Sequence, residues 1–167
     1  MSLSTKELRR ELKRQCKVHL IPYLNKNGFS QAAVIVDQPE TKPSGIFPFG
    51  KQERIKSGNL EVIQIQFDKY GRPAMRIAFG KVPVSGIITP CGESIDMNDA
   101  ILTCLPVFYE LYSSRFTRRW FKLSLLEPKT EHSLERLVRY ILELSNELLV
   151  WFETENIGKH VHVVDQR

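Results

Sequence analysis

Cysteine is scarce in this chain, and no segment has the length of a membrane span. The three cysteines, Cys16, Cys91 and Cys104, form no CxxC pair among 167 residues, so the sequence indicates neither a disulfide framework nor a zinc knuckle. The apolar runs fall short of the roughly 20 residues that cross a bilayer, and the start lacks the apolar stretch of a signal peptide. We therefore expect a cytoplasmic protein without a membrane partner.

Familiar catalytic signatures are missing as well. The chain contains no P-loop, no GxGxxG turn after a strand, no GxSxG elbow and no HExxH helix. His160 and His162 are candidate metal ligands, but no acidic or cysteine partner lies nearby in sequence and transition-metal sites use three or four ligands, which favours a solvated tail. Nothing indicates an activating base for Cys91 or Cys104. We expect no cofactor and no metal, and the sequence favours a protein that is not an enzyme.

Positive charge is present in excess, and it is concentrated in one place. The chain has 24 Lys and Arg against 19 Asp and Glu, a formal net charge of +5. Residues 1–28 contain seven basic and two acidic residues, so this segment carries 7 − 2 = +5 and the rest of the chain is neutral. With 42% hydrophobic and 26% charged residues, the composition excludes a disordered or collagen-like chain. The length fits a single domain.

The basic N-terminal segment predicts an amphipathic helix. Ser4 and Glu7 form an S-x-x-E capping box at its start, and apolar residues recur at four-residue spacing behind it. On a helical wheel five cations fall within about 100° on the opposite side. This basic stripe consists of Lys6, Arg10, Lys13, Arg14 and Lys17. It could follow a phosphate backbone, attract an acidic protein or lie against anionic lipid, or it is a solvated helix face.

Other positions of this helix carry expectations too. Pro22 is expected to kink or restart the helix, and Asn27 with Gly28 offers a left-handed C-cap. His19 falls on the apolar side of the wheel with Leu12, which favours a packed, hydrogen-bonded histidine.

The middle of the chain predicts a sheet with one apolar and one polar face. Residues 29–36 and 46–55 are strand candidates, and residues 60–67 and 74–79 are two strand-like runs joined by a turn-rich connection, as in a hairpin. Period-two alternation places Ile63, Ile65 and Phe67 on one face with Met75, Ile77 and Phe79. Gln64, Gln66 and Arg76 then lie on the other face.

The remaining segments complete an α+β domain. We expect an irregular crossing over residues 80–92, a helix over 96–112 that Pro106 interrupts, a strand over 115–126, and a long amphipathic helix over 130–155. The predicted fold is a single domain over residues 1–158, with a mostly antiparallel, curved sheet flanked by the N- and C-terminal helices. Residues 159–167 are expected to form a polar tail.

Cations and aromatic residues are interleaved in residues 115–122. If this segment is a strand, Arg118, Trp120 and Lys122 share one face, and if the strand joins the central sheet that face also holds Gln64, Gln66 and Arg76. Such a face suits an anionic or aromatic group, and stacking on Trp120 would suit single-stranded nucleic acid. In the alternative interpretation, residues 80–92 cover this face and Trp120 only packs there.

Several short motifs together resemble a known family. They are IPYLNKNGF (residues 21–29), VIQIQ (62–66), RIAFG (76–80) and RWFKL (119–123), followed by a long C-terminal helix. In this order they resemble a family of small bacterial proteins that is described only as a domain of unknown function. The resemblance implies a helix that leads into a curved antiparallel sheet, a bacterial origin and a binding role, since some relatives are thought to be immunity or neutralising proteins. It supplies no catalytic residues.

Three functions remain open on the sequence. The leading expectation is a non-enzymatic cytoplasmic binding protein, with an acidic protein among the partners considered and neutralisation or sequestration of a partner as its role. The second is nucleic-acid binding through the basic stripe and the Trp120 face. The third is an enzyme that acts on a small anionic substrate in a cleft beside residues 80–92.

Overall fold

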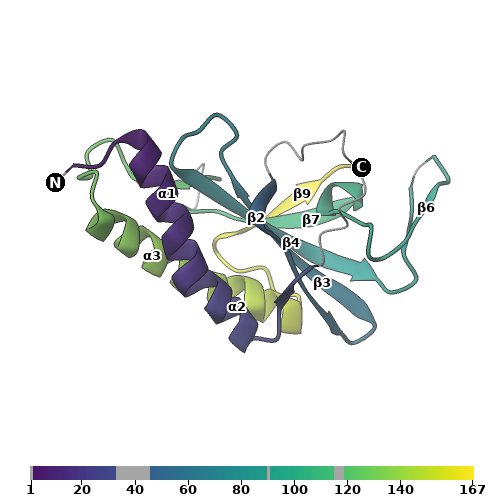
Figure 1. The fold of residues 1–167 in the computed structure, drawn as a ribbon. Coiled ribbons are helices and arrows are strands. Elements are labelled where there is room, and N and C mark those ends of the chain that lie inside the picture. Colours follow the sequence, from purple (N-terminus) through teal and green to yellow (C-terminus); the bar gives the residue numbers. More distant parts are fainter. Residues whose placement is uncertain (1, 33–45, 90, 115–118) are drawn as a thin grey trace.

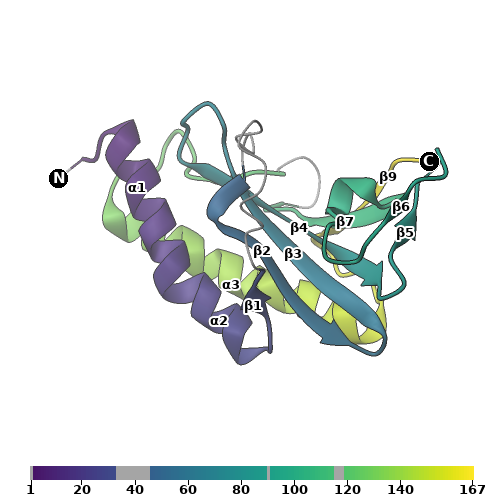
Figure 2. The ribbon, with the colours of Figure 1, turned by 45° about the vertical axis from the view of Figure 1, so that its right-hand side comes forward.

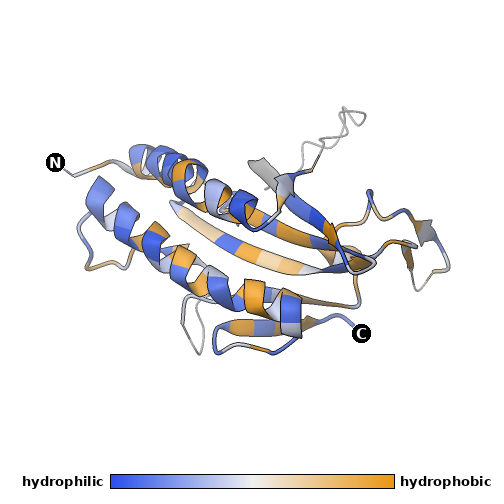
Figure 3. Cartoon of the chain, turned by 90° about the horizontal axis from the view of Figure 1, so that it is seen from below, coloured by the Kyte–Doolittle hydropathy of each residue, from blue (hydrophilic) through white to orange (hydrophobic). Residues whose placement is uncertain are grey.

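Two helical segments lie side by side across one face of an antiparallel sheet (Figures 1 and 3). The computed structural model describes residues 2–32, 46–89, 91–114 and 119–167. Its helices are α1 (Thr5–Gln15), a π-helical turn (Cys16–Leu20), α2 (Ile21–Lys26), a 3₁₀ turn (Leu102–Cys104) and α3 (Glu131–Thr154). The predicted α+β fold, with helices packed on one face of the sheet, is confirmed.

The main sheet has the strand order β1-β2-β3-β4-β7-β9, and β8 also pairs with β4. Its strands are β1 (Ser30–Gln31), β2 (Ile46–Lys56), β3 (Asn59–Phe67), β4 (Ala74–Pro83), β7 (Val107–Leu111), β8 (Phe121–Lys122) and β9 (Val161–Asp165). The pairings between them are antiparallel. A small hairpin of β5 (Ile87–Ile88) and β6 (Ser94–Ile95) projects from one end of the molecule (Figure 1).

The start of α1 is held by the predicted capping box. The Glu7 N–H donates to the Ser4 hydroxyl at 3.3 Å, and the Ser4 N–H donates to the Glu7 carboxylate at 2.8 Å. At the other end of the segment, Gly28 adopts a φ of 84°, the left-handed conformation that the predicted C-cap requires. In the part of the chain that the structure describes, no helix is both long and apolar enough to span a bilayer.

Four-residue spacing of apolar side chains accounts for the π-helical turn. The five members of the row, Leu8, Leu12, Cys16, Leu20 and Leu24, are all buried. An α-helix turns about 100° per residue, so each four-residue step rotates the next side chain by about 40°, and a uniform α-helix would turn the row away from the sheet. The π turn winds more slowly and absorbs this drift. Pro22 follows directly, in the first turn of α2, where the helix restarts as predicted.

The hairpin of β3 and β4 forms the centre of the core. Its register pairs Ile63 with Phe79 and Ile65 with Ile77, and these residues face the helices as predicted. The long helix α3 covers them with Leu134, Val138, Ile141, Leu144 and Leu148. The Trp151 and Phe79 rings complete the packing with their centroids 5.3 Å apart.

We call the face turned away from α1 and α3 the distal face (Figure 2). It is only partly polar. At one end of it, a second small core buries Leu60 and Val62 beneath Leu102, Leu105 and Phe108. The cover comes mainly from residues 100–108 rather than from residues 80–92 alone. Residues 80–83 also prolong β4 instead of beginning an irregular crossing.

Two further predictions are wrong. Residues 96–112 do not form a helix: a 3₁₀ turn ends before Pro106, and β7 follows because Tyr109 and Leu111 pair with Phe79 and Ile77 of β4. The last residues do not form a polar tail either, since β9 pairs along the whole of β7. Three of its five residues are the β-branched valines that suit a strand.

The strand expected over residues 115–126 is reduced to β8, and its residues 115–118 lie outside the described part. The strand expected over residues 29–36 is seen as β1, and its residues 33–36 lie outside as well.

Deleting Val18 tests the origin of the π turn. Val18 is half exposed, and its removal shortens the spacing between Cys16 and Leu20 to three residues, which a regular α-helix aligns with the rest of the row. We expect the free energy of unfolding in urea to change by no more than about 1 kcal/mol. Inserting an alanine after Val18 is the matched control. It turns Leu20 and Leu24 out of the core and should cost at least about 4 kcal/mol. Equal costs would contradict this explanation.

The turn between β3 and β4 predicts a pH dependence. The buried Asp68 carboxylate accepts from the Tyr70 and Arg72 N–H groups and from the Arg72 guanidinium, and the Arg72 bonds hold the pKa of Asp68 below its ordinary value. The ionised carboxylate therefore stabilises the fold above pH of about 4, and this contribution is lost as the pH falls through the lower pKa of the folded state.

We expect Asp68→Asn to lower the free energy of unfolding by about 1 kcal/mol or more at pH 7, and the difference from wild type to shrink toward pH of about 2. Urea unfolding across this range measures it, with Glu93→Gln, at an exposed carboxylate, as the control. A difference that stays constant with pH would argue against an ionised Asp68.

Candidate binding site on the distal face

The polar end of the distal face is built by three neighbouring strands and the residues before β8. β3 contributes Gln66, β4 contributes Arg76, and β7 contributes Glu110, each with its side chain on the side away from the helices. Arg119 and Trp120, which precede β8, reach the same place. We call these five residues the distal cluster.

Glu110 is the centre of the distal cluster. Its residue is only 2% exposed, and its Oε1 accepts a hydrogen bond from the Arg119 Nη2 at 2.6 Å. The Arg76 Nη1 lies 3.7 Å from the same oxygen. One carboxylate thus faces two guanidinium groups, and its hydrogen bond to Arg119 raises the pKa of that arginine.

Arg76 is held by groups of a different kind. Its Nε donates to the Gln66 side chain, and its guanidinium carbon lies 5.4 Å from the centre of the Trp120 ring. Burial lowers the pKa of Arg76 from its ordinary value, the positive charge of Arg119 adds to this effect, and Glu110 opposes it. The Arg76 guanidinium is thus in contact range of an amide oxygen, an aromatic ring and a carboxylate.

An aromatic and histidine pair extends the cluster onto β9. His162 lies directly opposite Glu110 in the β7–β9 ladder. Its ring stacks on Tyr112 with the centroids 3.8 Å apart and the planes inclined by 15°. His162 is therefore part of the sheet surface and not a residue of a solvated tail.

Three of the six residues predicted for this surface are brought together: Gln66, Arg76 and Trp120. Gln64 lies one step along β3, half-buried and opposite Lys51 of β2. Lys122 is exposed at the edge of the sheet and lines a separate cavity of about 300 Å³ beside Tyr140. Arg118 lies outside the described residues.

The sequence did not predict four further residues of this surface: Glu110, Arg119, Tyr112 and His162. The alternation in Val107–Leu111 would have placed Glu110 on the polar face if the segment had been interpreted as a strand. The valines that flank His162 are likewise typical of a strand, which would have placed His162 in the sheet.

The basic stripe on α1 is weaker than predicted. Arg14 donates two hydrogen bonds to Glu11, at 2.8 and 2.6 Å, so its charge is compensated locally. Lys13 is half-buried with its Nζ 5.9 Å from the Phe67 ring, and burial lowers its pKa. Lys6, Arg10, Arg14 and Lys17 are exposed. They belong to α1 and the π turn, and these helices cover the face of the sheet opposite the distal face (Figure 2).

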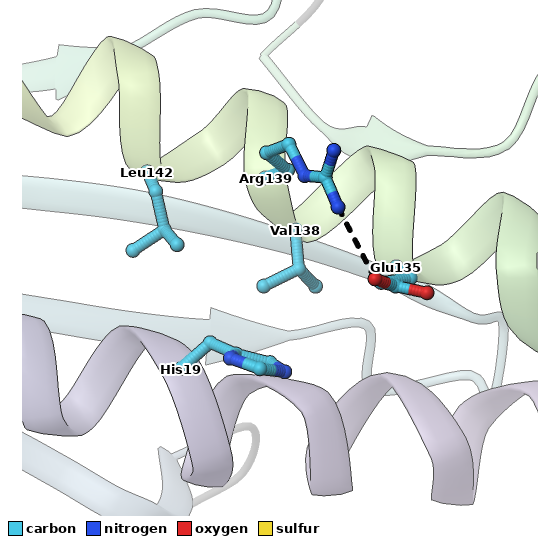
Figure 4. A pocket seen from close by; sticks show the side chains of 5 residues that line it. All are labelled: His19, Glu135, Val138, Arg139 and Leu142. Carbon is cyan, nitrogen blue, oxygen red and sulfur yellow. Dashed lines mark hydrogen bonds and ion pairs between the residues drawn. The ribbon is translucent and has the colours of Figure 1, made fainter.

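His19 is exposed and not packed in the core as predicted. The prediction assumed a uniform α-helix, whereas His19 belongs to the π turn. It lines a cavity of about 140 Å³ between the two helical segments, opposite Glu135 and Arg139 of α3 (Figure 4). Arg139 donates to Glu135 at 3.2 Å along α3, beside this small space.

The remaining candidates for chemistry have structural surroundings. Burial raises the pKa of the Cys16 thiol to about 12, which opposes a role as a nucleophile. His160 is engaged with Glu147, with 2.6 Å between its Nδ1 and the carboxylate, and this contact ties the chain before β9 to α3. Among the residues that the structure describes, no three His, Cys, Asp or Glu side chains are grouped to hold a metal ion.

Comparison with known proteins returns no match to a family model, to a curated protein or to a solved structure. The family resemblance therefore stays a prediction, and the candidate site rests on the geometry alone.

Replacing Glu110 tests its place at the centre of the cluster. We expect Glu110→Gln to lower the free energy of unfolding by about 1–3 kcal/mol, because Arg119 and Arg76 lose the negative charge between them. Glu155→Gln is the matched control, since it removes an exposed carboxylate that lies 2.8 Å from Lys81. Its effect on urea unfolding should be clearly smaller. A control variant that is destabilised as strongly would show that burial of Glu110 adds nothing.

Proposed function

We propose that this chain is a non-enzymatic binding protein, of bacterial origin and cytoplasmic location, that captures a partner protein with the distal face of its sheet. Neutralising or sequestering that partner is its role in the proposal. The observation that carries the proposal is the distal cluster itself, in which a buried carboxylate pairs with two arginines and one of these arginines lies over a tryptophan ring.

The composition of this surface suits protein recognition. Arginine, tryptophan and tyrosine dominate the residues that contribute most to protein interfaces. Trp120, Arg76 and Tyr112 are half-buried, so part of each side chain is already ordered before a partner arrives. Ordering these groups in advance lowers the entropic cost of binding.

The two alternatives find less support. The cavities beside His19 and beside Tyr140 are lined by no described residue of 80–92, where a substrate cleft was expected. For nucleic acid, the basic stripe and the Trp120 surface lie on opposite sides of the sheet, so they do not form one continuous basic and aromatic surface.

Photo-crosslinking in the source bacterium tests the proposal. A photoreactive phenylalanine analogue at Trp120 should capture one specific protein, whereas the same group at Val150, a half-exposed position on α3, should not. The purified partner should bind wild type, and Trp120→Ala should weaken its Kd about tenfold, as for a residue at an interface centre. Identical products from both positions, or a Kd that Trp120→Ala leaves unchanged, would contradict a binding role for the distal face.

A further inference from the structure

We propose that the distal cluster is a carboxylate-binding site, which takes an Asp or Glu side chain or the C-terminal carboxylate of the partner. This inference rests on the proposed function and specifies the chemistry of the group that is recognised. The site consists of Arg76 and Arg119, organised by Glu110 and supported by Trp120.

The charges of the cluster are unbalanced. Two guanidinium groups share one carboxylate, and the sharing is unequal, since Arg119 bonds to Glu110 at 2.6 Å whereas Arg76 lies 3.7 Å away, beyond hydrogen-bonding distance. The Arg76 side chain is 24% exposed, so its charge is largely withdrawn from water, and its ion pair with Glu110 is long and shared with Arg119. A buried charge of this kind is stabilised by a counter-charge. One further carboxylate would supply it.

An unpaired donor beside Glu110 supports the same conclusion. Among the described residues, the buried Arg119 Nε has no acceptor, and an incoming carboxylate would supply one. Glu110 Oε2 and His162 Nε2 are also buried without a partner among those residues, but Oε2 is itself an acceptor, which a second carboxylate does not satisfy. Buried polar atoms in proteins are nearly always hydrogen-bonded, and exceptions often mark a place for water or a ligand. These three atoms belong to neighbouring side chains, since Arg119 bonds to Glu110 and His162 lies opposite it in the ladder.

The charge of the site also distinguishes a carboxylate from a phosphate. Arg76, Arg119 and Glu110 together carry one net positive charge. A carboxylate, with one negative charge, neutralises it and matches the two-pronged geometry of a guanidinium. A phosphate group carries between one and two negative charges near neutral pH and would leave an excess beside Glu110. The geometry therefore favours the carboxylate.

NMR titration with a model ligand tests the inference. The probe is hexaglutamate with blocked ends, and hexaglutamine of the same length is the uncharged control. We expect saturable shifts of the Trp120 indole and Arg76 Nε–H resonances with hexaglutamate only. Arg76→Gln should weaken the binding of hexaglutamate about tenfold. Arg76→Lys keeps the charge but loses the two parallel hydrogen bonds of a guanidinium group, and it should weaken the binding less. Arg10→Gln, on the basic stripe, should leave it unchanged.

Several results would overturn the inference. One is the absence of Trp120 shifts while the resonances of Lys6, Arg10 and Lys17 move; another is inorganic phosphate that displaces hexaglutamate at equal or lower concentration. Thermal unfolding of Arg76→Gln shows whether the variant is folded, and Arg76→Lys serves if it is not. If the partner captured at Trp120 binds the protein while hexaglutamate does not, the carboxylate site is wrong and the proposed function stands. If hexaglutamate binds and no partner is captured at Trp120, the proposed function is wrong and the carboxylate site stands.

Discussion

One face of the β3–β4 hairpin requires a cover, because Ile63, Ile65 and Phe67 stand there beside Met75, Ile77 and Phe79. Both helical segments pack on this one face and cover it. For α3 a regular amphipathic helix is sufficient, but the N-terminal segment carries its apolar residues at a spacing that an α-helix cannot keep in line. The π turn at Cys16–Leu20 resolves the mismatch by local unwinding. The basic side chains of α1 are thereby left on the outer surface, and the opposite face of the sheet is left without a long helix.

That opposite face is divided between two kinds of surroundings. At one end a short 3₁₀ turn and Phe108 close a small apolar core over Leu60 and Val62. At the other end, among the described residues, Glu110 is buried among polar and aromatic groups instead. A buried carboxylate requires positive partners, and Arg119 and Arg76 provide them from different segments. The site is thus a consequence of how the sheet is covered, and its chemistry follows from one carboxylate shared by two arginines.

Local patterns in the sequence predicted the capping box, the hairpin with its two faces and the long C-terminal helix, because each depends on residues close together in the chain. They also placed Gln66, Arg76 and Trp120 on one surface. Glu110 and His162 could not be predicted as members of the site, because β7 and β9 form through pairing with strands distant in the sequence. In β7 the apolar residues Phe108 and Leu111 also fit a helical spacing, and only pairing with β4 settles the conformation as a strand. The exposed position of His19 could not be predicted either, because a helical wheel assumes a uniform α-helical period.

The distal cluster depends most on Glu110 and Arg119 acting as a unit. A double-mutant cycle with Glu110→Gln, Arg119→Gln and the double variant, read by urea unfolding, measures their coupling directly. We predict a coupling free energy of about 1 kcal/mol or more, because each single change leaves the other charge without its partner. Effects that add to within about 0.3 kcal/mol would contradict the account, since the two side chains would then be independent neighbours.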